Sequence, residues 1–192
     1  MEKTLKQHPS TLIKIVLFGP ESTGKTTLSR QLAEHYNTVW APEFAREYLQ
    51  NKWDNEFTIC EAEDILPIAQ GQISLENEQA KKAKQLLICD TNLLETKVYA
   101  EVYFENYSNS ILNNAVNDHN YDLYFLTYID TPWEADDLRD KPNEREEMFN
   151  IFEEALKKYN KPYILLKGNK EARLQKAISA ISQLLEQKPN LK

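Results

Sequence analysis

The feature that most constrains this chain is an octapeptide that directly follows a short apolar run. Residues 12–18 form the run, interrupted only by Lys14, and residues 19–26 then read Gly-Pro-Glu-Ser-Thr-Gly-Lys-Thr. The octapeptide matches the phosphate-loop pattern G-x-x-x-x-G-K-[ST] at every fixed position. In such a loop, backbone N–H groups face an anion at a helix start, where the helix dipole adds about half a positive charge. The sequence therefore predicts a strand, a turn that cradles a polyphosphate, and a helix over residues 26–36.

Two side chains of this loop have predicted roles. Lys25 is expected to reach the terminal phosphates, and the Thr26 hydroxyl is expected to ligate the Mg²⁺ that bridges them. A turn that merely joins a strand to a helix is the alternative interpretation, and both flanking elements disfavour it. Residue propensities give no reason for the carboxylate of Glu21 beside phosphates.

Strands and helices alternate along the rest of the chain. Apolar runs predict further strands at residues 37–41, 86–89, 121–129 and 162–166, while helical spacing predicts helices at residues 43–50, 61–84, 93–107 and 143–159 and a closing helix that includes residues 174–185. Pro67 is expected to break or kink the long helix near Leu66. Asn143, with Glu146 three residues later, is expected to cap the helix after it, and residues 108–120 are expected to form a loop.

This order predicts an α/β chain with a three-layer P-loop kinase fold. Strands separated by helices form a parallel sheet, here of five strands, with helices on both faces and a short lid at about residues 130–145. We find no internal repeat and no change of composition, so residues 1–192 are expected to form a single domain. In such sheets the chemistry lies beyond the carboxyl ends of the strands.

Acidic residues follow two of the predicted strands. Asp90 closes the strand at 86–89, where a P-loop protein keeps the acid that organises Mg²⁺, although an aspartate before Thr91-Asn92 is also typical of a helix cap. Glu43 follows the strand at 37–41 and could accept the proton of an attacking hydroxyl, or could simply pair with Arg46 or face solvent. Both alternatives stay open for Glu43.

Two later segments could also contribute to a nucleotide site. A mobile lid at residues 130–145 would use Arg139, ahead of Arg145, to neutralise charge on a transferred phosphoryl group, unless this charged connection is simply solvated. Trp133 could stack on a flat ring or act as a partly buried anchor. Gly168 and Asn169 lie where backbone groups could hold an adenine, or where an ordinary turn and helix cap would serve.

Composition limits the partners. The chain has a formal net charge of -7 and only one small basic group, Lys81, Lys82 and Lys84, so nucleic acid is not expected as a partner. No apolar run approaches the roughly 18 residues of a membrane span, and the first residues lack a signal peptide's apolar stretch, so we expect a cytoplasmic protein without a membrane partner. Cys60 and Cys89 are then expected to be two buried thiols.

Motifs beyond the phosphate loop resemble those of one family. The matching segments are Glu43-Phe-Ala-Arg46-Glu47-Tyr48, Asp64 with Ala69-Gln70-Gly71-Gln72, Asp90-Thr91, and Trp133 with Asp136, Leu138 and Arg139. With the loop, and in this order, they resemble the kinase domain of NadR-type proteins, which are P-loop nicotinamide riboside kinases. The resemblance runs from about Ile13 to the last helix. It also gives a reason for Glu21, because G-x-E-S-x-G-K is the usual form of that family's loop.

The resemblance implies ATP-dependent phosphorylation of the 5′-hydroxyl of nicotinamide riboside, an NAD-salvage step, with ATP and Mg²⁺ as cofactors and a small riboside as partner. It implies that Asp90 serves the metal or is the base and that Arg139 belongs to the lid. The residues it places at the nucleotide are Gly19, Glu21, Ser22, Thr23, Gly24, Lys25, Thr26 and Thr27. Those it places nearest the riboside are Glu43, Arg46, Asp64, Gln72 and Trp133.

Other functions share some of these features. A kinase of another nucleoside or nucleotide would have the same fold and loop, and a regulatory or motor NTPase is disfavoured by the short chain and by the lack of an N-K-x-D motif. Members of the family often carry an adenylyltransferase module upstream. About eleven residues precede the first predicted strand, and no H-x-G-H occurs, so we do not expect adenylyl transfer from this chain.

Overall fold

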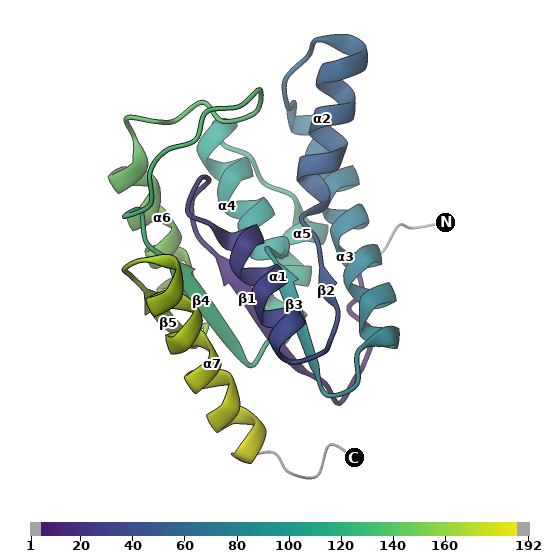
Figure 1. Cartoon of the computed structure of the whole chain (residues 1–192). Coiled ribbons are helices and arrows are strands. Elements are labelled where there is room, and N and C mark those ends of the chain that lie inside the picture. Colours follow the sequence, from purple (N-terminus) through teal and green to yellow (C-terminus); the bar gives the residue numbers. More distant parts are fainter. Residues whose placement is uncertain (1–4, 188–192) are drawn as a thin grey trace.

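A parallel five-stranded sheet forms the centre of the computed structural model, which describes residues 5–187 (Figure 1). The strand order is β2-β3-β1-β4-β5, and every neighbouring pair is parallel. The strands are β1 Ile13–Phe18, β2 Trp40–Ala41, β3 Leu86–Asp90, β4 Leu123–Thr127 and β5 Tyr163–Leu166. All residues of β1, β3 and β4 are buried, as expected for strands covered on both faces. The predicted α/β fold is confirmed.

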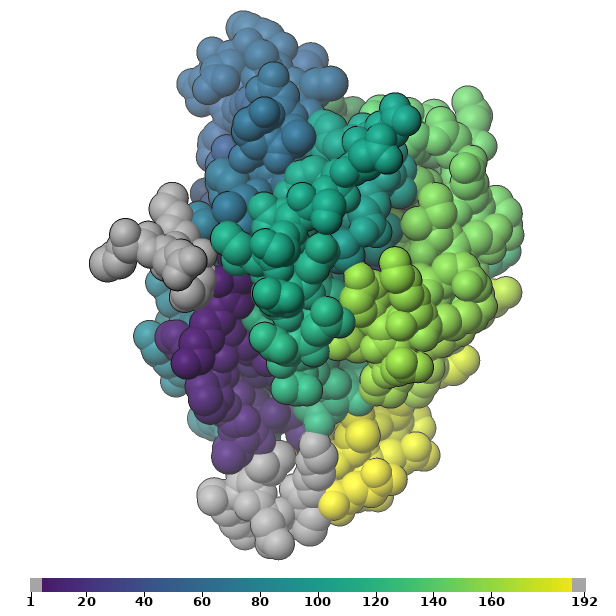
Figure 2. All heavy atoms as spheres, turned by 180° about the vertical axis from the view of Figure 1, so that it is seen from behind, coloured from purple at the N-terminus to yellow at the C-terminus, as the bar shows by residue number. Residues whose placement is uncertain are grey.

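Helices cover both faces of the sheet. On one face α1 (Lys25–His35) and α7 (Lys170–Gln187) pack on Ile13, Ile15 and Leu17. On the other, Val16 and Phe18 pack among residues of α3 (Ile65–Lys82), α4 (Leu93–Tyr103), α5 (Ser110–Asp118) and α6 (Arg145–Lys158). This alternation along β1 is the period of two that a strand imposes on its side chains. Figure 2 shows this second face, on which α4 contacts α3, α5 and α6.

One helix projects from the body of the molecule. The helix α2 (Phe44–Glu56) contains no fully buried residue and packs on α3, and Figure 1 shows it rising beyond the end of the sheet. A short 3-10 helix, η1 (Ala62–Asp64), leads from it into α3. Among residues 5–187, no helix has both the length and the apolar character that a membrane span requires.

Three local expectations were wrong. Residues 110–118 form α5 rather than part of a loop, because Asn109 caps this segment and Leu112, Ala115 and Val116 share a buried face. Asn143 does not cap α6, since Glu144 occupies the cap position and makes no side-chain cap bond. Cys89 is buried as expected, but Cys60 is only partly buried, and both are free thiols.

Pro67 does not interrupt a helix where the sequence suggested. The helix α3 begins at Ile65, so Pro67 lies in its first turn, where backbone N–H groups have no partner within the helix in any case. The discontinuity lies instead at the junction between η1 and α3.

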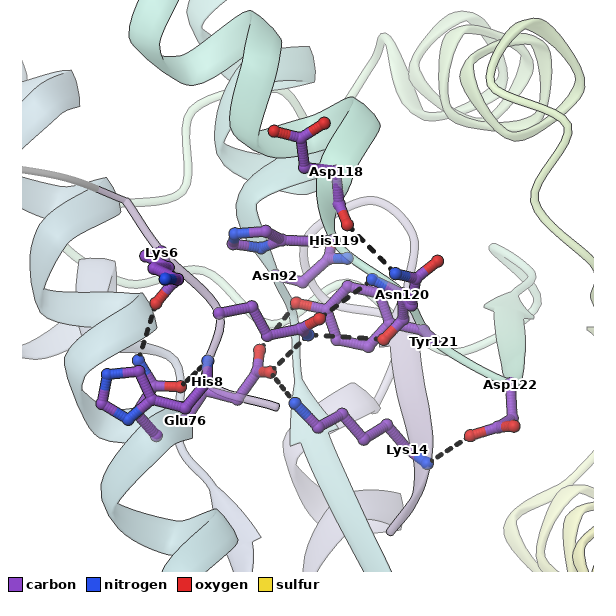
Figure 3. A network of polar contacts seen from close by, with 12 residues as sticks. Lys6, His8, Lys14, Glu76, Asn92, Asp118, His119, Asn120, Tyr121 and Asp122 are labelled. Atoms are coloured by element: carbon purple, nitrogen blue, oxygen red, sulfur yellow. Dashed lines mark hydrogen bonds and ion pairs between the residues drawn. The ribbon is translucent and has the colours of Figure 1, made fainter. Parts of the chain in front are cut away.

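A buried polar network fastens the N-terminal segment to the end of the sheet remote from the phosphate loop (Figure 3). The ammonium of Lys14 lies 2.9 Å from the carboxylate of Glu76, to which the Tyr121 hydroxyl also donates at 2.6 Å. Gln7 donates to the same carboxylate, and the ring of His119 bonds the carbonyl of Leu5 at 2.7 Å. Because each of these side chains has a partner and Lys14 lies near the start of β1, we assign the network to structure rather than to catalysis.

Candidate active site

The phosphate loop joins the end of β1 to the start of α1. Gly19 has a φ of 142°, and a Cβ at this position would lie 2.6 Å from the Thr127 hydroxyl and 2.9 Å from the Thr127 carbonyl oxygen. Glycine is therefore needed here both for its backbone angle and for the close approach of β4. Gly24, with a φ of 83°, precedes the first residue of α1. The predicted strand, turn and helix are all present.

Lys25 lies folded against its own loop. Its side-chain nitrogen donates to the carbonyl of Gly19 at 2.6 Å and to the carbonyl of Pro20 at 3.0 Å. The same nitrogen lies 3.1 Å from a carboxylate oxygen of Glu95, in the first turn of α4, and Lys25 is 8% exposed. Burial lowers the pKa of Lys25, but the charges of Glu95, Glu43 and Asp90 outweigh it, so the net direction is upward.

Asp90 ends β3 next to the phosphate loop and is fully buried. Neither of its carboxylate oxygens has a partner at normal hydrogen-bond geometry among the described residues, although the nearby Thr26 side chain favours its charged form. Burial, and then the charge of Glu43, raise its pKa to about 7. Asp90 is not a helix cap, because Asn92 caps α4 by accepting the amides of Leu94 and Glu95.

Glu43 stands at the start of α2, immediately after β2, as the strand-end position predicts. Gln72 of α3 holds the residues on either side of Glu43. Its side chain accepts a hydrogen bond from the Phe44 amide at 2.8 Å and donates one to the Pro42 carbonyl at 3.2 Å. A Cβ on Gly71 would lie 2.1 Å from the Phe44 ring, so this ring packs directly on the α3 backbone. Gln72 and Gly71 thus fix the segment that carries Glu43.

Asp136 organises the connection between β4 and α6 and ties it to α2. Its carboxylate lies 2.6 Å from the Arg46 guanidinium and 3.2 Å from that of Arg139. The same carboxylate accepts the amides of Leu138 and Arg139. Burial would raise the pKa of Asp136, but the bond from Arg46, the Leu138 amide and the charge of Arg139 hold it below its ordinary value. Arg46 therefore pairs with Asp136, rather than with Glu43 as the sequence allowed.

The same connection also touches the phosphate loop. The Ser22 hydroxyl accepts the amide of Glu134 at 2.9 Å, and Glu21 accepts the amide of Lys141 at 3.3 Å. Arg145, the first residue of α6, donates to the carbonyl of Ser22 at 3.3 Å and lies over the ring of Trp133 at 5.7 Å. Arg145 thus contacts the loop, whereas Arg139 turns toward Asp136.

Asp64 is already engaged within the protein. Its carboxylate accepts the Tyr48 hydroxyl at 2.9 Å and the Lys52 ammonium at 2.6 Å, and it also accepts the amide of Glu61 in a capping box. Burial raises its pKa, but these bonds outweigh burial and lower it overall. Beside Asp64, an open groove of about 440 Å³ runs along α2.

Gly168 and Asn169 form a turn and a helix cap. The Gly168 amide donates to Asp130 at 2.6 Å, and Asn169 accepts the amide of Ala172 at 2.9 Å. Both residues are exposed. Their backbone leads into α7, so the structure contains the turn-and-cap arrangement that the sequence offered as one alternative.

Three buried residues of the site were missed by sequence reasoning. Thr127 packs against Gly19, and Glu95 lies beside Lys25. Arg173 of α7 donates to the carbonyl of Thr23 at 2.7 Å and also contacts Asp130, so it links the phosphate loop to the residues that follow β4. The spacing of Glu95 after the strand-end Asp90 could have placed it near the loop, but no sequence pattern marks Arg173.

The fold and the loop together define a class. A parallel sheet whose central strand ends in a phosphate loop, with an acid at the end of the neighbouring strand, is the architecture of P-loop kinases. Residues 14–173 match the model of the family described as "AAA domain" (AAA_28), so the chain belongs to that family.

Two curated relatives are each named trifunctional NAD biosynthesis/regulator protein NadR. The protein of Salmonella typhimurium (strain LT2) is 25% identical over 89% of this chain, and that of Escherichia coli (strain K12) is 28% identical over 78%. The matched regions are 42% and 37% of those proteins, so the chain spans less than half the length of the curated relatives it matches.

Solved structures share the fold. A NadR protein in complex with NR has a TM-score of 0.75 at 22% identity, covering 90% of this chain and 51% of that one. Thymidylate kinase from Ehrlichia chaffeensis has a TM-score of 0.62 at 16% identity, covering 91% of this chain and 100% of its own. Deoxyadenosine kinase from M. mycoides with bound dATP has a TM-score of 0.59 at 15% identity, covering 88% and 99%.

Proposed function

We propose that this protein is an ATP-dependent kinase that phosphorylates the 5′-hydroxyl of nicotinamide riboside. The observation that carries the proposal is the meeting of three groups at the carboxyl edge of the sheet. Glu43 after β2 and Asp90 at the end of β3 both act electrostatically on Lys25 of the phosphate loop. Such an edge can hold a polyphosphate on one side and a hydroxyl acceptor on the other.

Mg²⁺ fits the residues beside the loop. Both carboxylate oxygens of Asp90 are buried, and neither makes a hydrogen bond of normal geometry with a described residue. The Thr26 hydroxyl lies close by. Within residues 5–187, no group of three or more His, Cys, Asp and Glu side chains could hold a metal alone. That suits Mg²⁺, which commonly uses one or two carboxylates and takes other ligands from water and phosphate. When bound, Mg²⁺ would neutralise phosphate charge.

Transfer in this site would form one bond and break another. The hydroxyl oxygen would attack the γ-phosphorus, the bond from that phosphorus to the oxygen retained by ADP would break, and the hydroxyl proton would pass to Glu43. We assign the proton to Glu43 because this carboxylate is only partly buried at the start of α2, whereas Asp90 is enclosed beside Thr26. Lys25 and Arg139 would balance charge on the transferred group.

The substrate assignment rests on the relatives and on the residues near Glu43. Both curated relatives carry NAD biosynthesis in their names, and one NadR structure holds NR. In this chain Arg46 and Trp133 would lie nearest the riboside. Asp64 and Gln72 would act by holding α2, because internal bonds already engage their polar atoms. A kinase of another nucleoside is the second candidate, favoured by the nucleoside and nucleotide kinases that share the fold.

The test is ADP formation from Mg-ATP with a panel of acceptors. Nicotinamide riboside, adenosine, deoxyadenosine and thymidine are each supplied to the whole chain, with one reaction lacking any acceptor. We expect nicotinamide riboside to give the largest kcat/KM, with its mononucleotide as the product. A larger kcat/KM for another nucleoside would assign that nucleoside as the substrate instead. ADP formation at the same rate with and without an acceptor would indicate an ATPase.

The matched variant for this test is Lys25→Ala. Loss of the ammonium should lower turnover at least about 100-fold, because the phosphate charge would lose its main protein partner. Lys176→Ala removes an exposed lysine of α7 and should leave turnover unchanged. If both variants turn over at the wild-type rate, the phosphate loop is not the site of transfer.

A further inference from the structure

Glu95 is a buried carboxylate that the proposed transfer does not use. It is 2% exposed and lies in the first turn of α4, five residues beyond Asp90. One carboxylate oxygen lies 3.1 Å from the Lys25 nitrogen, and the other accepts the Gly19 amide at 3.3 Å. Glu95 therefore contacts both Gly19, the first residue of the phosphate loop, and Lys25, the lysine of the same loop.

Three acceptors surround the Lys25 ammonium. A lysine side chain has three N–H donors, and its nitrogen here has three near neighbours: the carbonyls of Gly19 and Pro20 and the Glu95 carboxylate. A phosphate that enters the loop must replace at least one of them. Lys25 donates hydrogen bonds to the two carbonyls, whereas the Glu95 oxygen at 3.1 Å makes an ion pair without a hydrogen bond of normal geometry, so Glu95 is the neighbour that a phosphate displaces most easily.

We propose that Glu95 is a positioning residue that holds Lys25 back against the loop until the phosphates of the nucleotide displace it. The proposal rests on the proposed nucleotide site, but not on the identity of the riboside. A carboxylate and a phosphate compete for one ammonium, because both are anions that accept strong charge-assisted hydrogen bonds from it. Glu95 thus sets the affinity of the loop for nucleotide through Lys25.

The charges around Glu95 give this competition a direction with pH. The groups that face it are Lys25 from α1, Glu43 before α2, Asp90 at the end of β3 and Tyr99 farther along α4. Burial raises the pKa of Glu95 to about 8, with Lys25 opposing and Glu43 and Asp90 adding to the rise. The carboxyl is then largely protonated near pH 6.5, half ionised near pH 8 and mostly ionised at pH 8.5, so it competes with phosphate mainly at the higher pH.

The experiment compares AMP-PNP binding by the wild type and by Glu95→Gln, with Mg²⁺ and without riboside, by titration calorimetry. Glutamine keeps the size of the side chain and can still accept the Gly19 amide, but it carries no charge. At pH 8.5 we expect Glu95→Gln to bind about 3 to 10 times more tightly than the wild type. At pH 6.5 the two dissociation constants should agree within about twofold.

Two further variants separate this role from a merely structural one. Glu101→Gln makes the same charge change farther along α4, where Glu101 pairs with Lys97, and should leave binding unchanged at both pH values. In a Lys25→Ala background, Glu95→Gln should no longer tighten binding, because the competition acts through Lys25. Tightening that persists without Lys25 would overturn the proposal, as would weaker or equal binding by Glu95→Gln at pH 8.5.

Glu95→Asp is the second variant if glutamine prevents folding. It keeps the charge but shortens the side chain, so the carboxylate withdraws from Lys25, and this variant should bind AMP-PNP more tightly than the wild type at pH 8.5. Equal or weaker binding by this variant would also overturn the proposal. Because no acceptor is present, a wrong riboside leaves these outcomes untouched, whereas failure of the wild type to bind AMP-PNP would refute the nucleotide site itself.

Discussion

The side chain of Gln72 replaces a helical hydrogen bond that the first residue of α2 cannot make. Its amide oxygen accepts the Phe44 N–H at 2.8 Å, and the first amides of a helix have no partner within the helix. Its amide nitrogen binds the carbonyl of Pro42 at 3.2 Å, so one buried side chain spans the residue between them, Glu43. The position of the proposed base therefore depends on a residue of α3.

Gln72→Leu should lower kcat more than it lowers nucleotide affinity. Leucine has a similar size but leaves the amide of Phe44 and the carbonyl of Pro42 without their partner, so Glu43 should lose its fixed position. We expect kcat to fall about 10- to 100-fold and the free energy of unfolding to fall by about 1 to 2 kcal/mol. Steady-state kinetics and urea unfolding measure the two effects.

Gln79→Leu is the control for this variant, since Gln79 lies on the same helix with no contact to the start of α2 in the described hydrogen bonds. Its kcat should match that of the wild type. A wild-type kcat for Gln72→Leu would show that Glu43 needs no such support or is not the base.

The sequence was sufficient for the sheet and the loop because both have strong local patterns. Each predicted strand is a short apolar run, and β1 with residues 19–26 matches a motif whose physics is local. The helix α5 was missed because its polar residues look like a loop, although Leu112, Ala115 and Val116 have helical spacing. Boundaries also shifted, since α2 continues to Glu56 rather than ending at Gln50.

The site was only partly predictable because long-range contacts decide which charges pair. The sequence placed Lys25, Thr26, Asp90 and Glu43 at one edge of the sheet, and the structure brings them together. It could not show that Arg46 pairs with Asp136, 90 residues away in the chain. Nor could it show that Asp64 and Gln72 use their polar atoms inside the protein.

Two glycines of the phosphate loop should differ in their tolerance of alanine. A Cβ on Gly19 would meet the side chain and the backbone of Thr127, whereas a Cβ on Gly24 would meet nothing within 4 Å. Both have positive φ, so alanine strains the backbone at either position, but only Gly19→Ala must also displace β4. We expect Gly19→Ala to lose about 3 kcal/mol or more of unfolding free energy and Gly24→Ala to lose about 1 to 2 kcal/mol. Equal losses in urea unfolding would contradict the close approach of Thr127.

Asp90→Asn should remove activity without removing stability. The side chain makes no helix cap, and asparagine removes a buried charge whose desolvation opposes folding. At pH 8 we expect Mg-ATP turnover to fall by about 100-fold or more, with an unfolding free energy equal to or above that of the wild type. Asn92→Ala is the contrasting variant, since it loses the real cap and should cost about 1 kcal/mol. If Asp90→Asn were the less stable of the two, a structural role for Asp90 would be favoured.

The ion pair of Asp130 with Arg173 should make stability depend on pH in acid. Burial raises the pKa of Asp130, but the Gly168 amide and Arg173 outweigh burial and hold the pKa below its ordinary value of 3.8. The folded chain therefore binds a proton at Asp130 more weakly than the unfolded chain does. The ion pair contributes its full stabilisation of the folded chain above pH 3.8, and this contribution is lost as the pH falls through the lower pKa of the folded chain. Asp130→Asn should therefore be less stable than the wild type at pH 6, with the difference shrinking toward pH 2. A difference that stays constant from pH 6 to pH 2 in thermal unfolding would contradict the shift.

Alanine at the two arginines near the lid should affect different kinetic constants. Arg145 donates to the Ser22 carbonyl of the phosphate loop and lies over Trp133, so Arg145→Ala should loosen the loop and raise the KM for ATP by about tenfold. Arg139 faces Asp136 within the lid and makes no described contact with the loop, so Arg139→Ala should leave nucleotide affinity unchanged. If the lid brings Arg139 to the transferred phosphoryl group, the kcat of Arg139→Ala should fall about 10- to 100-fold. Steady-state kinetics with both substrates varied separates the constants, and a fall in kcat confined to Arg145→Ala would assign the charge-balancing role to Arg145 instead.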